Sequence, residues 1–171
     1  GNTGEFGYAR IGDFEACEIP YGNGAFTMVI MLPIEKSLDE CLANLTQESF
    51  EALLDDFDVQ NLEVCMPDWE MSDEINFDKL LSNVGYKNIL GPVTNYLSIS
   101  DNQLWVEMKQ KNYIKVDKKG TIIASGSHSS GMVTAYIPEK GYLFNANHPF
   151  LYLVRETSTG AILLIGKIGK L

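Results

Sequence analysis

One stretch of the sequence constrains the fold more than any other. Residues 26–32 read FTMVIML, a run that is apolar on both faces of an extended chain and is followed by Pro33. The run is far shorter than the roughly 18 apolar residues that a membrane-spanning helix needs. A strand with two apolar faces has to be covered on both sides. This segment is therefore expected to be a central strand of a sheet that lies inside a stack of layers.

The surrounding sequence alternates between strand and helix signals. Residues 14–21 are rich in β-forming types and are joined to the apolar run by Gly22-Asn23-Gly24, which predicts a tight hairpin. Ser37 and Thr46 each precede an apolar helical repeat as N-caps, and Gly85 follows a third repeat in the C-cap position. The predicted fold class is α+β, with further strands at 61–67, 104–116, 150–154 and 161–165 and short helices at 37–45, 46–57 and 77–84.

Charge and composition exclude several partners. The chain has 13 Lys and Arg residues against 23 Asp and Glu residues, a net charge of −10 at pH 7. An acidic protein repels phosphate backbones and anionic membrane surfaces, so we expect no nucleic acid partner. Because no apolar run reaches the length of a membrane-spanning helix, we also expect no membrane span. The three cysteines, at positions 17, 41 and 65, form no CxxC pair and are expected to be buried free thiols.

The sequence lacks the residues of an enzyme. It contains no GxSxG motif, and its only possible imidazole bases are His128 and His148. His128 lies in a Ser-rich stretch typical of a solvated residue, and His148 precedes an apolar strand, where a hydrogen bond to backbone is expected. The acidic run 55–58 lacks the spacing and glycine of a calcium loop and is interpreted as a solvated helix end. We expect neither catalysis nor a cofactor or metal.

Several motifs together resemble one protein family. Residues 144–154, FNANHPFLYLV, resemble the C-terminal signature of the serpins, the serine protease inhibitors, and residues 155–167 resemble the family's closing hairpin. EIPY at 18–21, TMVIMLP at 27–33 and VCMP at 64–67 are similar to family segments in the same order. The resemblance implies that residues 1–171 form a single C-terminal serpin-like segment, a β-rich multi-sheet half with a few short helices and an incomplete main sheet.

By the same resemblance, residues 118–142 form a reactive-centre loop with its hinge. Locally, Asp117 to Gly120 reads as a turn, and the stretch after it has no apolar period. In the family this loop is cut by a protease and inserts into the main sheet as a new strand while the enzyme is still attached. Ile122 and Ile123 depart from the family's usual acid and Ala, so the resemblance leaves inhibitor and substrate behaviour both open. The hinge residues it implies are Lys118, Gly120, Thr121, Ile122, Ile123 and Ala124.

A pair of reversed charges suggests an ion pair at the base of the loop. Lys118 stands where the family usually has Glu, and Asp68 stands where it usually has Lys. Because attraction survives when both signs reverse, we hypothesise that Asp68 and Lys118 form a clasp at the top of the main sheet. The alternative is two unrelated surface charges. Gln110 replaces a His that is common at the sheet centre.

Family spacing places the cleavable bond at Thr134-Ala135, with Met132-Val133 as the competing site. Small and medium apolar residues fit an elastase-like pocket better than a trypsin-like one. The implied partners are an elastase-like protease of the serine or the cysteine class, and either the missing N-terminal half or another chain that completes the main sheet. The implied location is extracellular, periplasmic or at the cell surface. The second reading is a non-inhibitory binding or scaffold module with the same fold.

Overall fold

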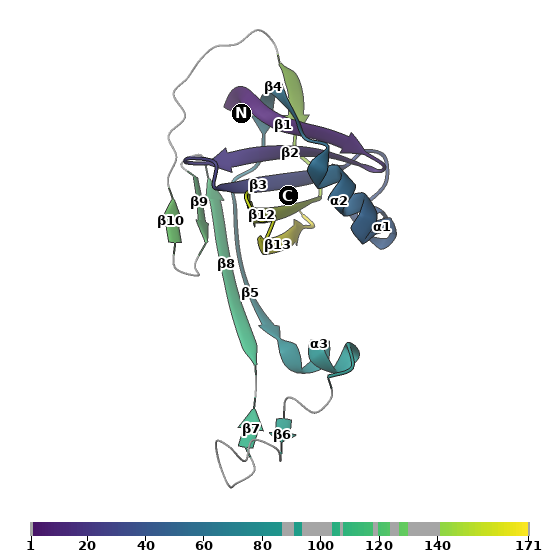
Figure 1. Cartoon of the computed structure of the whole chain (residues 1–171), viewed down its shortest axis with the longest axis vertical. Helices are drawn as coiled ribbons and strands as arrows, with labels where there is room; N and C mark the ends of the chain where they lie inside the picture. Colours follow the sequence, from purple (N-terminus) through teal and green to yellow (C-terminus); the bar gives the residue numbers. More distant parts are fainter. Residues whose placement is uncertain are drawn as a thin grey trace. The chain divides into compact units, whose positions relative to one another are not determined.

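Figure 1 shows the chain as a computed structural model, which describes residues 2–86, 91–93, 104–106, 108–117, 120–123, 127–129 and 141–170. The chain divides into two compact units. One consists of Gly1–Asp68, Asp117–Gly120 and Ser129–Leu171, and the other consists of Trp69–Val116 and Thr121–His128. The larger unit contains a seven-stranded sheet and two helices, and the smaller unit is built on a pair of long strands.

The seven-stranded sheet has the strand order β11-β4-β1-β2-β3-β12-β13. Every neighbouring pair is antiparallel except β11 and β4, which run parallel. The strand bounds are β1 (Asn2–Ile11), β2 (Phe14–Tyr21), β3 (Phe26–Pro33), β4 (Asp58–Cys65), β11 (Tyr142–Asn145), β12 (Phe150–Glu156) and β13 (Ile162–Ile168).

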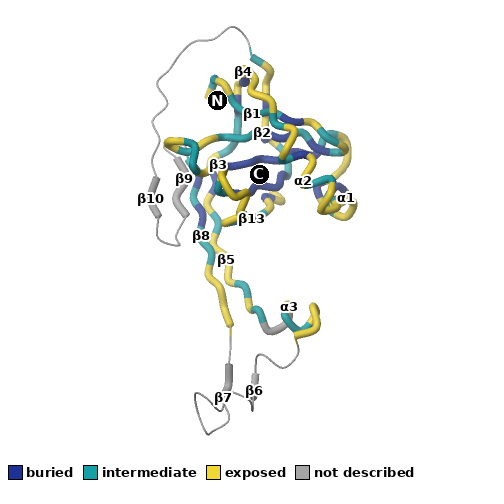
Figure 2. Tube along the Cα trace, in the orientation of Figure 1, coloured by how far each residue is buried: buried dark blue, intermediate teal, exposed yellow. Residues whose placement is uncertain are grey.

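Strand β3 confirms the prediction made from the apolar run. All of its residues except Phe26 are buried, and it pairs with β2 on one side and β12 on the other. Figure 2 shows β3 and β12 as the buried centre of this sheet. The closing hairpin of β12 and β13 is also formed as predicted, with Gly160 in the left-handed conformation that its turn requires.

Two short helices cover part of the sheet. Helix α1 (Leu38–Asn44) begins after Ser37, and α2 (Gln47–Asp55) begins after Thr46. Both N-cap hydroxyls accept a backbone N–H at the third helical position, which confirms the two predicted helix starts. Buried helix residues join sheet residues in one core cluster, made of Ala9, Phe14, Ala16, Val29, Met31, Leu38, Cys41, Leu53, Leu151 and Leu153.

The smaller unit contains all or most of each remaining element: β5 (Trp69–Asn76), α3 (Phe77–Asn83), β6 (Gly91–Val93), β7 (Leu104–Val106), β8 (Lys109–Asp117), β9 (Gly120–Ile123) and β10 (Ser127–Ser129). Four strands form a sheet in the order β10-β9-β8-β5, and β6 pairs with β7. Gly85 follows α3 with a φ of 96°, as expected for a residue that ends a helix.

Several element boundaries differ from the sequence predictions, two of them because of how the strands pair. The single strand predicted over 104–116 is wrong, because β7 pairs with β6 whereas β8 pairs with β5. Between β7 and β8, the Met108 carbonyl accepts a hydrogen bond from the Phe77 N–H at 2.9 Å, so the ladder changes partner there. Strand β4 starts at Asp58 rather than Asn61, because its first residues pair with β1.

Candidate functional site

The first end of the predicted reactive loop enters a sheet. Strand β8 ends at Asp117, and β9 begins at Gly120 and lies next to β8. The hinge residues Thr121, Ile122 and Ile123 therefore have extended backbone in β9. β-branched residues suit this conformation. Residues 118 and 119 lie outside the described residues, so the turn at 117–120 and the role of these residues as a hinge stay predictions.

The remaining predicted positions of the loop lie outside the described residues. These are Lys118, Ala124, Met132, Val133, Thr134 and Ala135. Asp68 is described and is exposed just before β5. The ion pair between Asp68 and Lys118 and the position of the cleavable bond therefore stay predictions.

Strands β5 and β8 present one charged face. Lys115 Nζ lies 3.7 Å from a carboxylate oxygen of Glu70, and Lys111 Nζ lies 3.3 Å from one of Glu74. Both pairs stand directly opposite each other in the antiparallel ladder. Opposite charges at such positions stabilise strand pairing. On the other face, Trp69, Ile114 and Val116 are buried.

The same strand pair, β5 and β8, accounts for two polar side chains. Gln110 donates a hydrogen bond to Asn112 Oδ1 at 2.7 Å, so the residue at the predicted sheet-centre position has a partner on its own strand. Tyr113 donates to Glu70 Oε1 at 3.2 Å. Burial and this hydrogen bond raise the pKa of the Tyr113 hydroxyl.

The second end of the predicted loop docks on the seven-stranded sheet through a glycine. A Cβ atom added at Gly141 would lie 2.8 Å from the backbone carbon of Asn61 and 3.2 Å from Leu62 Cα. Real Cβ atoms essentially never approach backbone below 3.0 Å, so this position requires glycine. From Tyr142 onward the chain pairs with β4 as β11, and Phe144 is fully buried.

Two tyrosines and one carboxylate lie beside this second end. Tyr8 and Tyr142 both donate hydrogen bonds to Glu15 Oε2, at 3.0 and 3.2 Å. Their rings meet edge to face with centroids 5.3 Å apart, an arrangement favoured by the charge distribution of aromatic rings. Burial, followed by the hydrogen bonds with Tyr142 and Glu15, raises the pKa of Tyr8 well above its ordinary value. The sequence analysis missed this cluster.

A second cluster holds the middle of the sheet together. The guanidinium of Arg155 on β12 lies 2.7 Å from Glu18 Oε1 on β2, and Thr27 on β3 donates to the same oxygen at 2.9 Å. Arg155 also donates to the Leu54 carbonyl at 3.4 Å and lies 5.8 Å from the centroid of the Phe57 ring. The cluster ties three strands to the end of α2.

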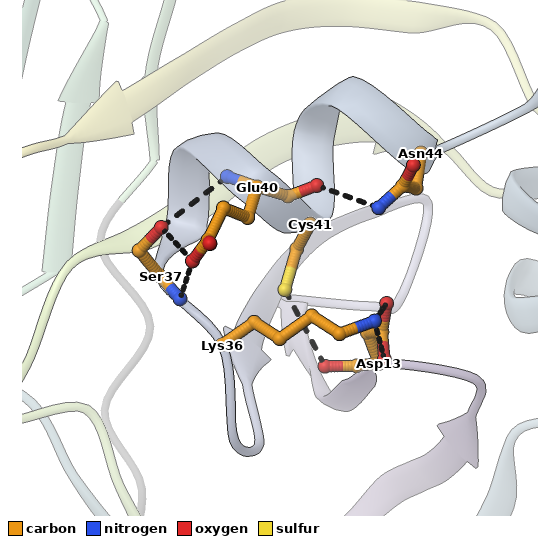
Figure 3. Close-up of polar contacts among 6 residues, drawn as sticks. All are labelled: Asp13, Lys36, Ser37, Glu40, Cys41 and Asn44. Atoms are coloured by element: carbon orange, nitrogen blue, oxygen red, sulfur yellow. Dashed lines mark hydrogen bonds and ion pairs between the residues drawn. The ribbon is translucent and has the colours of Figure 1, made fainter.

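A small cavity lies between the helices and the turn that joins β1 to β2. Its volume is about 190 Å³, and it is lined by Ile11, Gly12, Asp13, Phe14, Met31, Cys41, Asn44, Leu45, Ser49 and Leu53. Figure 3 shows Cys41 directed at the Asp13 carbonyl, with Sγ 3.9 Å from the oxygen, and Lys36 paired with Asp13 at 2.7 Å. Burial raises the pKa of the Cys41 thiol, the opposite of what activates a nucleophile.

The potential catalytic side chains that the structure describes occupy structural positions. His148 Nε2 lies 3.0 Å from the Pro33 carbonyl, which confirms the predicted backbone hydrogen bond. Cys17 and Cys41 are buried and Cys65 is half-buried, and all three are free thiols. Burial raises the pKa of Cys17 to about 12. In the part of the chain that the structure describes, no cluster of His, Cys, Asp or Glu is arranged to hold a metal ion, and no helix has the length and apolarity to cross a membrane.

With this geometry in view, comparison with known proteins assigns the family. The sequence model of the family "Serpin (serine protease inhibitor)" matches residues 1–171, so the chain belongs to the serpin family. The chain is 34% identical over 160 residues to Iripin-3 of Ixodes ricinus, covering 92% of this chain and 40% of that protein. It is 27% identical over 172 residues to antithrombin-III of Ovis aries, covering 96% of this chain and 37% of that protein.

Solved structures show the same fold. The native-state structure of tengpin, a thermophilic serpin, superposes with a TM-score of 0.79 at 24% identity, over 99% of this chain and 45% of that one. Native protease nexin-1 with heparin gives a TM-score of 0.79 at 19% identity, over 99% of this chain and 46% of that one. These likenesses confirm the predicted α+β, serpin-like architecture. The chain spans about two fifths of the length of the curated relatives it matches.

Proposed function

We propose that this chain is the C-terminal portion of a serpin-type protease inhibitor and carries its reactive-centre loop at residues 118–142. Membership of a family of serine protease inhibitors supports inhibition rather than enzymatic activity. The single observation that carries the proposal is the position of β9, which follows β8 and adds to its sheet as a further strand. A loop that acts by strand insertion needs a start of this kind.

In the proposed mechanism, a serine protease attacks the loop and forms an acyl-enzyme, and the cut loop then inserts beside β8. The driving force is the free energy released when a metastable sheet gains a strand. The loop residues that follow β9 would insert after Thr121, Ile122 and Ile123, which already lie in β9 beside β8. Their β-branched side chains favour extended backbone, but two bulky isoleucines also slow the passage of the hinge into a closed sheet. Slow insertion would turn the inhibitor into a substrate.

We place the cleaved bond at Thr134-Ala135, with Met132-Val133 as the competing site. The residue types around both bonds match the shallow apolar pocket of elastase-like serine proteases, and cysteine proteases are the second possible class. The proposed clasp between Asp68 and Lys118 would hold the base of the loop until cleavage. An exposed ion pair contributes about 0.2–1 kcal/mol, enough to bias the timing of insertion without preventing it.

The proposed inhibitor needs more strands in its main sheet than this chain supplies. Relatives are about two and a half times as long as the matched region, which supports completion of the main sheet by an N-terminal half or by another chain. We propose an extracellular, periplasmic or cell-surface location, where foreign or secreted proteases are met. Recovery of the protein from the medium or cell surface, rather than from the cell interior, tests this part.

The decisive experiment mixes an elastase-like protease with the protein expressed from its complete gene. An inhibitor of this class forms an acyl-linked complex that survives boiling in detergent, and the released C-terminal peptide starts at Ala135, or at Val133 for the competing bond. Thr134→Arg should redirect complex formation toward a trypsin-like enzyme, whose pocket carries a buried acid. Cleavage chiefly after Lys140 would contradict the assigned bond.

A second candidate function is a non-inhibitory binding or scaffold module. The observation that favours it is the pair of isoleucines at 122 and 123 in the hinge. This candidate predicts clean cleavage of the loop with full recovery of active protease. Ile123→Ala separates the two, because a smaller hinge residue should restore complex formation if slow insertion is the cause.

A further inference from the structure

We propose that Glu15, Tyr8 and Tyr142 form a tyrosine anchor that holds the far end of the reactive loop on the seven-stranded sheet. The three side chains act as positioning residues: they fix the point at which the chain leaves the loop and enters β11. The inference rests on the proposed function for the identity of the loop. It goes beyond that function by assigning residues, on β1 and β2, that control how the loop is presented.

Strand β11 needs such an anchor because its backbone contacts are few. It consists of Tyr142–Asn145 and lies at the edge of the described sheet, paired in parallel with β4. Its first two side chains, Tyr142 and Leu143, are 50% and 51% exposed, and Phe144 supplies most of its burial. A short edge strand with little buried surface opens more easily than the core strands of a sheet.

The anchor joins β11 to a strand that is not its neighbour. In the strand order, β4 and β1 lie between β11 and β2. Nevertheless the Tyr142 hydroxyl reaches Glu15 on β2 at 3.2 Å, and the Tyr8 hydroxyl on β1 donates to the same oxygen at 3.0 Å. Because the two rings also meet edge to face, displacement of Tyr142 breaks a charge-assisted hydrogen bond and an aromatic contact together.

The glycine that precedes Tyr142 completes the arrangement. Gly141 lets the backbone pass against Asn61 and Leu62 of β4, so the loop ends at a fixed point immediately before the anchor. A reactive loop whose end is held in place loses less conformational freedom when a protease binds it. The anchor therefore favours presentation of the loop by restricting β11, with no contact to the protease required.

Hydrogen–deuterium exchange of the full chain tests the anchor directly. In Tyr142→Phe, exchange of the β11 amides should rise about fivefold, the effect of losing a hydrogen bond of typical net strength. Exchange in β12 and β13 should stay unchanged. Glu15→Leu should have at least the same effect, whereas Glu15→Gln keeps a side-chain oxygen as acceptor and should raise exchange less.

Tyr113→Phe is the matched control. It removes a tyrosine–glutamate hydrogen bond of the same length, 3.2 Å, from the β5–β8 strand pair, and should leave β11 exchange unchanged. Unchanged β11 exchange in Tyr142→Phe, or an equal rise in β12 and β13, would overturn the anchor. Exchange is measured on the free chain, so the anchor is judged separately from inhibition. Failure to form a detergent-stable protease complex counts against the proposed function only.

Discussion

Ion pairs of similar chemistry have very different surroundings in the two units of this chain. In the seven-stranded sheet, Arg155 and Glu18 lie 2.7 Å apart with side chains only 14% and 19% exposed. In the β5–β8 strand pair, Lys111 and Glu74 lie 3.3 Å apart with side chains 81% and 47% exposed. The first pair is shielded and shares further hydrogen bonds, whereas the second is open to water and salt. The two ion pairs are therefore expected to contribute unequally to the free energy of unfolding, although their charges are the same.

The two regions also differ in how their strand register is fixed. Strand β3 is apolar on both faces, and its neighbours bury it, so a slip of one residue would leave apolar contacts unfilled. Strand β8 buries Ile114 and Val116 on one face and directs Lys111 and Lys115 to the other. Its register is specified by alternation and by opposed charges. Side-chain packing therefore fixes the register of β3, whereas the alternation of apolar and charged residues fixes the register of β8.

The largest loss of stability should come from removing one partner of the shielded ion pair between Arg155 and Glu18. Arg155→Ala leaves Glu18 without its cation in a mostly buried site, and we expect a loss of about 3–5 kcal/mol in the free energy of unfolding. Urea denaturation followed by tryptophan fluorescence measures it. Lys111→Ala is the control from the exposed pair and should change stability by less than about 1 kcal/mol. Similar losses in both variants would show that burial does not separate the two pairs.

The next largest loss of stability is expected where a glycine of the seven-stranded sheet lies against a tyrosine ring. Gly166 on β13 lies opposite Tyr152 on β12, and an added Cβ would lie 2.7 Å from Tyr152 Cζ. Gly166→Ala should therefore cost about 1–3 kcal/mol through overpacking. Gly169→Ala, where an added Cβ meets nothing within 4 Å, is the matched control and should fall within about 0.5 kcal/mol of the parent chain. A neutral Gly166→Ala would mean that the Tyr152 ring moves aside without cost.

The sequence correctly predicted those elements that depend on residues close to one another in the chain. The apolar run of β3, the caps at Ser37 and Thr46 and the closing hairpin depend on residues within a few positions of one another, and all were correct. Strand β5 was missed because its sequence WEMSDEIN is too polar to indicate a strand by itself. It forms by pairing with β8, where two of its acidic residues meet lysines.

The tyrosine anchor was missed for a different reason. Glu15 and Tyr142 are 127 positions apart and meet across strands that are not adjacent, so no spacing in the sequence signals the contact. The one available sign was Gly141, a glycine just before a β-rich segment, which often marks close backbone approach. The family resemblance supplied the loop and its limits, but the residues that hold its far end follow from three-dimensional packing.

A charge reversal at the exposed pair between β5 and β8 should change the free energy of unfolding less, and by an amount that depends on salt. Lys111→Glu places two carboxylates opposite each other in the β5–β8 ladder and should cost about 0.2–1 kcal/mol at low ionic strength. At 1 M salt, where screening acts within about 3 Å, most of the loss should disappear. Lys170→Glu makes the same change in net charge after the end of β13. If both variants lose stability equally, net charge rather than the opposed pair is responsible.

The smallest effect concerns a carboxylate that is held by hydrogen bonds instead of burial. Hydroxyl and backbone N–H donors from Ser158 and Thr159 lower the pKa of Glu156 to about 2 from an ordinary value of 4.5. A lowered folded-state pKa stabilises the protein above pH 4.5, and this stabilisation is lost as the pH falls toward 2. Ser158→Ala removes the first of these donors, and Glu156→Gln removes the titration altogether. Thermal unfolding from pH 2 to 6 should show a shallower rise of Tm with pH in Ser158→Ala and the shallowest in Glu156→Gln. Identical slopes in all three proteins would contradict the assignment and would leave burial as the factor that distinguishes the charges of this chain.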